Sequence, residues 1–179
     1  NSVSAFNFFN GEFNGVFSSA EFGNIVVGKI DKPNNQNDYI IYSDANFLVE
    51  NNFQCHVQEN DSPPKESTMQ RDANTLKCVT FYFEVDYNLY VSNNSNTTTA
   101  TNWATSMFKN VQTLFANDGV TTALNSVYVW TTPDVYNNIG DSSADYLFAF
   151  RDYRPVINGD VGVLVGIDPG GLGGVAFLD

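Results

Sequence analysis

The chain has 179 residues, of which 42% are apolar and 15% aromatic, which is enough for one packed domain or one domain with an appendage. Its net charge of −12 repels phosphate backbones and anionic lipid surfaces, which argues against a nucleic acid or a membrane as partner. No apolar run approaches the roughly 20 residues that a membrane-spanning helix needs.

Two features of the composition are typical of secreted proteins. The charged fraction is only 16%, and Asn, Ser and Thr supply much of the polar surface instead. The two cysteines are the smallest number that can form a disulfide. The sequence also begins at Asn1 without an initiator Met, so we expect either a removed leader or an excerpt of a longer product.

Residues 1–54 are predicted to form a small β-rich part. Its aromatic and apolar residues are interrupted by Asn10-Gly11 and Asn14-Gly15, two dipeptides that favour hairpin turns. Two further strands are predicted over residues 24–30 and 38–44, with the polar turn DKPNNQND between them. This pattern indicates a short meander of hairpins.

Residues 55–76 show no hydrophobic period and contain Pro63-Pro64 among many polar residues. Such a composition is typical of an exposed linker that proteases can cleave. We expect this linker to separate the β-rich part from a larger part, residues 77–179.

The larger part alternates between strand and helix patterns. Strands are predicted over residues 77–90, 122–131 and 160–167, and helices over residues 102–117 and from Ser142 or Ser143 to about Tyr153. Threonines at the end of the polar loop are expected to cap the first helix, and Gly119 stands where a C′ glycine belongs. The strand over 160–167 is apolar throughout and is expected to be buried. The order β-α-β-α-β predicts an α/β fold with a mostly parallel sheet and right-handed crossovers.

The glycine-rich run GGLGG, residues 170–174, follows a turn at Asp168-Pro169-Gly170 and continues as strand. A phosphate-binding loop would place such glycines before a helix, and no G-x-x-x-x-G-K-[ST] motif is present. Glycines within a strand more often mark a bulge or the close approach of another backbone.

His56 is the only histidine, and it stands in the polar linker beside Cys55. A catalytic zinc needs about three protein ligands, most often His, and one His with two Cys does not make a usual hydrolytic site. We therefore expect His56 to be an exposed linker residue. Glu84 and Asp86 share one face of a strand, which we expect to be solvated or to pair with a helix rather than to hold catalytic carboxylates.

Within residues 93–99 two triplets match the pattern for N-linked glycosylation, Asn93-Asn94-Ser95 and Asn96-Thr97-Thr98. Such triplets are common in Asn-rich chains, so a plain loop is expected unless the host glycosylates. The cysteines also leave two alternatives open. A disulfide between Cys55 and Cys78 would stabilise the fold by about 3 kcal/mol in the chain-entropy model, whereas a metal-binding role needs a metal that this chain alone does not hold.

Several segments from Lys77 onward resemble, in order and spacing, those of one enzyme family. KCVTFYFEVDYNLY is similar to its first strand, with Asp86 at the usual Asp, and NWATSMFKNVQTLFANDGV is similar to its first long helix. TTALNSVYVWTTPD with Trp130, DSSADYLFAFRDYRP and DVGVLVGID resemble its second strand, next helix and third strand. GGLGGVAFLD resembles its fourth strand, an antiparallel edge strand that lines the active-site cleft. The family is that of the metzincin zinc endopeptidases, in the reprolysin-like (adamalysin) branch and especially its secreted bacterial forms.

The resemblance implies that a peptide or protein substrate pairs antiparallel with this edge strand. An unpaired strand edge offers N–H and C=O groups to an extended chain, and glycines let a backbone approach closely. The expected substrate contacts are Leu172, Gly173, Gly174, Val175 and Ala176. Thr80 stands where relatives often carry a calcium-binding Glu, so the resemblance gives a calcium site little support.

In the family, H-E-x-x-H-x-x-G-x-x-H follows the edge strand, and its His residues hold zinc while its Glu is the general base. This chain holds no such motif, so we expect it to have no catalytic residues and to be inactive alone. Residues 1–54 then resemble the tail of a pro-domain, and the linker resembles a maturation site. Cys55 is placed to be the thiol that blocks zinc in such zymogens, as an alternative to its disulfide with Cys78.

The sequence thus predicts the pro-segment and N-terminal catalytic subdomain of a secreted zinc endopeptidase, whose remaining catalytic segment carries the zinc helix. The alternative is a non-catalytic extracellular binding or assembly module that uses an exposed edge strand to add a partner strand.

Overall fold

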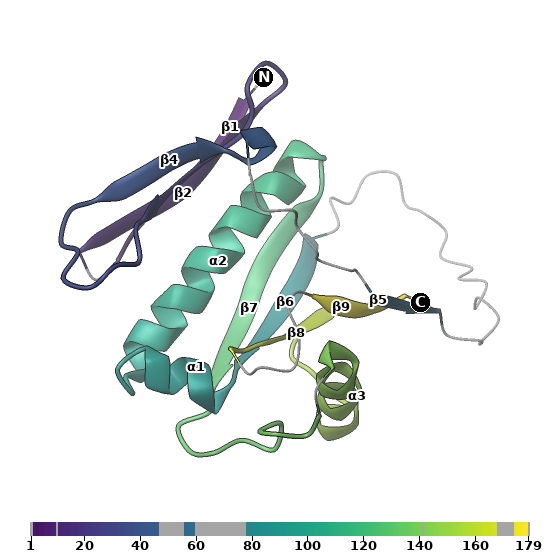
Figure 1. The fold of residues 1–179 in the computed structure, drawn as a ribbon. Coiled ribbons are helices and arrows are strands. Elements are labelled where there is room, and N and C mark those ends of the chain that lie inside the picture. The colour runs from purple at the N-terminus through teal and green to yellow at the C-terminus, as the bar shows by residue number, and fades with distance from the viewer. Residues whose placement is uncertain are drawn as a thin grey trace.

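A computed structural model describes residues 2–9, 11–46, 56–59, 78–140, 142–167 and 174–178. Within these residues the chain forms a four-stranded sheet, a three-stranded sheet and a two-stranded pair, together with the helices α1, α2 and α3 (Figure 1). The four-stranded sheet is antiparallel and the other two are parallel. The predicted mixed α/β class is confirmed.

The N-terminal strands form the predicted meander of hairpins. They are paired in chain order and comprise β1 (Ser2–Phe9), β2 (Glu12–Ser19), β3 (Gly23–Lys29) and β4 (Tyr39–Ser43). Phe9 pairs with Glu12, so the connection is the two-residue one predicted at Asn10-Gly11, and Gly11 has a φ of +72°.

The second hairpin turn predicted from the sequence, at Asn14-Gly15, is wrong because both residues lie within β2. Gly15 pairs with Phe6 on one side and with Val27 on the other. A Cβ atom at Gly15 would lie 2.4 Å from Cδ1 of Phe6, so this glycine makes room for an aromatic ring on the sheet.

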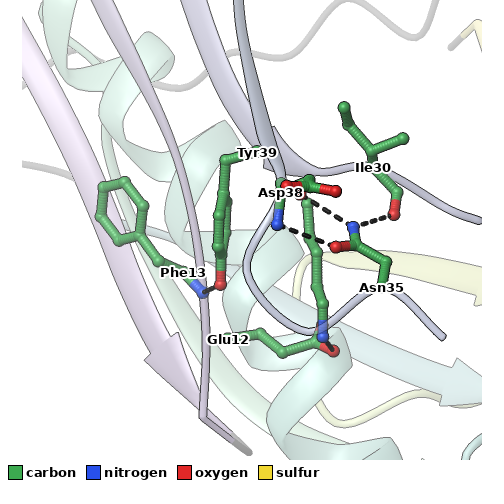
Figure 2. A network of polar contacts seen from close by, with 7 residues as sticks. Glu12, Phe13, Ile30, Asn35, Asp38 and Tyr39 are labelled. Atoms are coloured by element: carbon green, nitrogen blue, oxygen red, sulfur yellow. Dashed lines mark hydrogen bonds and ion pairs between the residues drawn. The ribbon is translucent and has the colours of Figure 1, made fainter.

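The polar connection between β3 and β4 is held together by the side chain of Asn35. Its Nδ2 donates to the carbonyls of Ile30 at 2.5 Å and Asp38 at 2.8 Å, and its Oδ1 accepts the Asp38 N–H at 2.8 Å (Figure 2). At the adjoining strand ends, the Phe13 N–H donates to the Tyr39 hydroxyl at 3.2 Å. The predicted polar turn is therefore a loop with its own internal hydrogen bonds.

The parallel sheet has β6 (Cys78–Val85) at its centre, between β7 (Thr121–Val129) and β8 (Val161–Val165). This arrangement confirms the mostly parallel sheet expected for residues 77–179. The burial expected for the third strand is wrong, since β8 lies at the edge of the sheet and its side chains are half-buried or exposed.

The first strand of this part is shorter than predicted. β6 ends at Val85 and α1 (Tyr87–Ser92) follows at once, although residues 87–90 were expected to continue the strand. The Asp86 carboxylate accepts the Leu89 N–H at 2.6 Å and so caps the helix. This cap outweighs the strand preference of the aromatic residues that follow it.

Helix α2 (Thr97–Asn117) begins earlier than the predicted residue 102. Its N-cap is Asn96 rather than a threonine, and the Asn96 Oδ1 accepts the Thr99 N–H at 3.0 Å. Gly119 has a φ of +76°, which agrees with its predicted place just beyond the helix.

Helix α3 (Ser143–Tyr153) begins and ends where the sequence predicts. A capping box joins Ser142 and Asp145 at its N-terminus. Arg154 is its C-cap, and Pro155 directly after it cannot continue the helix.

The two faces of β6 pack against different helices. On one face a core cluster joins β6 to α1 and α2 through Phe81, Phe83, Val85, Leu89, Ala100, Ala104 and Phe108. On the other face Tyr82 packs with Tyr136 and with Phe150 of α3. This division follows from the alternation of side chains along a strand.

The N-terminal meander packs on α2, which lies between the meander and the parallel sheet (Figure 1). The Asn7 Nδ2 donates to the Asn110 Oδ1 at 3.2 Å, and the Ser106 hydroxyl donates to the Asn14 Oδ1 at 3.1 Å. Polar side chains therefore contribute to the contact between the β-rich part and α2.

The last strand, β9 (Val175–Leu178), pairs in parallel with β5 (His56–Glu59). The sequence placed β9 as an antiparallel edge strand of the parallel sheet, and within the described residues its strand partner is β5 instead. Residues 56–59 of the exposed linker predicted over 55–76 form this strand. The rest of that linker lies outside the described residues.

Candidate functional site

Glu84 is the most completely enclosed charged group that the structure describes. Its side chain has no exposed surface, although it lies in a strand where the sequence favoured a solvated or helix-facing polar face. The solvated alternative is wrong, and the helix-facing one is confirmed, since Arg154 at the end of α3 contacts Glu84.

Both carboxylate oxygens of Glu84 accept hydrogen bonds. Oε1 accepts from the Trp130 Nε1 at 2.6 Å and from the Tyr136 hydroxyl at 2.9 Å. Oε2 accepts from the Tyr82 hydroxyl at 2.6 Å and from the Arg154 Nε at 2.6 Å. A buried carboxylate is costly unless it is paired and hydrogen-bonded, and here it is both.

These contacts set the protonation states in this group of residues, which we call the Glu84 cluster: Tyr82, Glu84, Trp130, Tyr136 and Arg154. Burial alone would raise the pKa of the Glu84 carboxyl, but the four donors outweigh burial and hold that pKa below its ordinary value. Burial and the neighbouring carboxylate together raise the pKa of the Tyr82 and Tyr136 hydroxyls. At neutral pH the cluster therefore holds an ionised carboxylate and neutral phenols.

The Arg154 guanidinium is held by aromatic rings as well as by Glu84. Its Cζ lies 4.9 Å from the ring centroid of Tyr128, 5.1 Å from that of Tyr153 and 5.8 Å from that of Trp130. The cluster thus joins β6, the end of β7, the loop after it and the C-terminus of α3. A carboxylate with this many donors is a poor general base, so its role is to hold these elements together.

Asp86 connects the end of β6 to the segment after β8. It is 3% exposed, and its Oδ2 accepts the Ile167 N–H at 3.3 Å while its Oδ1 caps α1. A Cβ atom at Gly166 would lie 2.1 Å from the Asp86 Oδ2, so only glycine fits there. Asp86 thus holds α1 and the segment after β8, whereas Glu84 holds the donors described above.

A cavity of about 330 Å³ lies beside this cluster, between α3, β8 and β9. Its lining is mostly apolar and includes Tyr146, Leu147, Phe150, Leu164, Val175 and Ala176. Gly162 forms part of its wall, and a Cβ there would lie 3.1 Å from Phe150. Its size is at the lower end of the range for small-ligand sites.

Three of the five predicted substrate-contact residues, Gly174, Val175 and Ala176, line this cavity. The other two, Leu172 and Gly173, lie outside the described residues. The described residues of the predicted substrate strand therefore line an apolar cavity, which the sequence alone did not indicate.

An aromatic–cationic contact fixes β9 against α3. The rings of Phe148 and Phe177 lie 5.4 Å apart, and the Arg151 guanidinium lies 5.0 Å and 5.2 Å from their centroids. α3 thus contacts β9 through Phe148 and Arg151, and it contacts Glu84 through its C-cap Arg154.

The predicted zinc-blocking thiol, Cys55, lies outside the described residues, and so its disulfide with Cys78 also stays a prediction. Cys78 is the first residue of β6 and is exposed. His56 begins β5, of which the backbone pairing is described.

Metal ligands are not grouped in the part of the chain that the structure describes. No set of three or more His, Cys, Asp or Glu side chains is placed there to hold an ion. Thr80, at the position compared with a calcium-binding Glu, donates its N–H and hydroxyl to the Asp160 Oδ2 at 2.8 Å and 2.7 Å. Both hydrogen bonds lower the pKa of the Asp160 carboxyl, and the bond from the Thr80 backbone N–H has the larger effect.

No helix among the described residues combines the length and apolarity needed to cross a bilayer. No protein-family model matches the chain, and no curated protein matches it at a significant level.

Sequence reasoning missed the Glu84 cluster. A usable signal was present, since Tyr82 and Glu84 alternate with apolar residues and share one face of β6. The partners Trp130, Tyr136 and Arg154 come from three later segments, and only the folded chain brings them together.

Proposed function

We propose that this chain is part of a secreted zinc-dependent endopeptidase in its pro-form. It comprises the pro-segment and the upper part of the catalytic domain, and β9 is the strand that pairs with the peptide substrate. The zinc ligands and the general base come from another segment of the parent enzyme.

The observation that carries this proposal is the parallel pairing of β5 with β9. β5 begins directly after Cys55, within the segment predicted to be the maturation site. On this proposal, backbone of the linker that follows the pro-domain tail takes up one edge of the strand expected to bind substrate. Since a strand edge has one row of N–H and C=O groups, the pro-segment and a peptide cannot use the same edge together.

The direction of β5 is also consistent with a segment that blocks the substrate-binding edge of β9 without being placed as a substrate. A substrate is expected to run antiparallel to β9, whereas β5 runs parallel to it. The pro-segment therefore lies in the reverse direction to a substrate. The cavity lined by Gly174, Val175 and Ala176 further supports the proposal, because it gives room for a peptide side chain beside the strand.

The experiment compares the complete gene product, loaded with zinc, before and after cleavage within residues 60–77. Chelator-sensitive hydrolysis of a quenched peptide library should be low before cleavage and rise at least about tenfold after it, because 1.4 kcal/mol of blocked binding corresponds to a factor of ten. Equal rates before and after cleavage, or a complete product without zinc, would overturn the proposal.

A backbone variant tests the covering role of β5 directly. Proline removes an N–H, and alternate N–H groups of a strand point to one partner, so Val57→Pro or Gln58→Pro breaks a β5–β9 bond. One of these two variants should raise the activity of the uncleaved product. Val57→Ala and Gln58→Ala, which keep the N–H, should leave it latent.

The second candidate function is a non-catalytic binding or assembly module. It is favoured by the open edges of β7 and β8, each of which has a strand partner on one side only among the described residues. The continuation of the reading frame separates the candidates: H-E-x-x-H-x-x-G-x-x-H favours the protease, and a stop codon after Asp179 favours the module.

A further inference from the structure

Two neighbouring triplets with the glycosylation pattern lie between α1 and α2, and the structure separates them. Both match N-x-[ST] equally well in the sequence. The amide nitrogen of the Asn side chain is the atom to which a glycan is attached, so its surroundings in the fold decide whether the modified side chain fits.

Asn93 uses that nitrogen inside the fold. It is the C-cap of α1, it is half-buried, and its Nδ2 donates to the Leu89 carbonyl at 2.9 Å. Its backbone N–H donates to the carbonyls of Leu89 and Tyr90, each at 3.1 Å. A sugar on the Asn93 Nδ2 would have to enter the space beside the last turn of α1 or break this bond.

Asn96, in contrast, does not use its side-chain amide nitrogen in the fold that the structure describes. It is exposed, and its side chain acts through Oδ1, which accepts the Thr99 N–H as the N-cap of α2. Its Nδ2 makes no hydrogen bond with the residues that the structure describes. Thr97 and Thr98, which complete the triplet, are exposed as well.

We propose that Asn96 is an acceptor site for an N-linked glycan and that Asn93 is not. The donor is an oligosaccharide on a lipid pyrophosphate. The Asn96 Nδ2 forms a bond to the anomeric carbon, the bond from that carbon to the pyrophosphate oxygen breaks, and the lipid pyrophosphate leaves with the electron pair while the amide loses one proton. The Oδ1 stays available to cap α2.

The position of Asn96 suits a bulky surface group. It precedes α2 at the end that α1 adjoins, away from β5 and β9 (Figure 1). A glycan there leaves the β5–β9 pair uncovered, so this inference rests on secretion of the chain and not on the proposed peptidase activity.

The test is secretion of the chain from a eukaryotic cell line, followed by site-resolved mass spectrometry of the folded product. A third triplet, Asn60-Asp61-Ser62, lies outside the described residues, so a total mass shift is not sufficient. Most copies should carry a glycan at Asn96 and few at Asn93. A secreted product with Asn96 unmodified, or with Asn93 modified equally, would overturn the proposal.

Matched variants keep the test independent of folding. Thr98→Ala destroys the triplet but keeps the Asn96 cap, so it should lose the glycan while the thermal unfolding midpoint of the deglycosylated protein stays unchanged. Thr98→Ser keeps the triplet and should keep the glycan, and Ser95→Ala should leave modification at Asn96 as it is. Loss of the Asn96 glycan in Ser95→Ala would contradict the assignment.

Discussion

The two faces of β6 bury their side chains by different physical means. Phe83 and Val85, which are 6% and 0% exposed, face α2 among apolar neighbours. Glu84 lies between them in the sequence and is also 0% exposed, but it faces four hydrogen-bond donors. An apolar face is stabilised by each methylene it buries, whereas a polar one is stable only when all its partners are present.

The largest expected effect comes from breaking the polar face. Glu84→Ala leaves Arg154, Tyr82, Trp130 and Tyr136 without their acceptor, and the free energy of unfolding should fall by about 3–5 kcal/mol, as for other broken buried pairs. Urea denaturation followed by tryptophan fluorescence measures this change.

The control removes both charges together. The double variant Glu84→Leu with Arg154→Met replaces the pair by apolar groups. It should recover part of the unfolding free energy lost in Glu84→Ala, because no unpaired charge remains, but Tyr82, Trp130 and Tyr136 still lack their acceptor. If the double variant loses as much as the sum of the single ones, the pairing of Glu84 with Arg154 does not hold the polar face together.

The apolar face should respond less strongly to a neighbouring substitution. Val85→Ala removes two buried methyl groups, and the expected loss is about 2 kcal/mol of unfolding free energy from transfer and cavity terms together. The same denaturation series measures it. A loss larger than that of Glu84→Ala would reverse the order of the two faces.

The N-caps of α2 and α3, the helices that cover the two faces of β6, are expected to contribute similar amounts to the free energy of unfolding. Asn96→Ala at α2 and Ser142→Ala at α3 each remove one N-cap acceptor and should cost about 1 kcal/mol. Thermal unfolding measures both, and Asn96→Ser and Ser142→Asp, which retain a capping oxygen, serve as matched controls. A loss near zero in either alanine variant would show that its helix is held by packing alone.

The smallest expected effect is on how the free energy of unfolding depends on pH. The pKa of Glu84 is lower in the folded chain than in the unfolded chain, so its contribution is fully present above the unfolded value of about 4.3 and is lost as the pH falls through the folded value. Stability should therefore fall more steeply in acid for the wild type than for the Glu84→Leu, Arg154→Met variant. If the free energies of unfolding of the two proteins fall equally as the pH is lowered, the pKa of Glu84 is not lowered by folding.

The sequence predicted the elements whose signals are local. The hairpin at Asn10-Gly11, the helix ended by Pro155 and the glycine after α2 each follow from one or two residues with restricted backbone preferences. Gly15 was misread because its role is to accommodate Phe6 from another strand, and no local pattern reports that neighbour.

The site was predictable only in part, for the same reason. Val175 and Ala176 were recognised as strand, but their pairing with β5 joins segments more than a hundred residues apart. Apart from Tyr82 of β6 itself, the donors around Glu84 come from the residue directly after β7, from the loop that follows and from the C-cap of α3, so their meeting depends on the whole parallel sheet being formed.

The most direct test of the central claim is an intact mass and metal analysis of the natural product, with peptide mapping beyond Asp179. The proposed function predicts a peptide that carries H-E-x-x-H-x-x-G-x-x-H, on the same chain or on a nicked companion, and one bound zinc. A natural product whose mass closes at these 179 residues, and which binds no zinc, would contradict it.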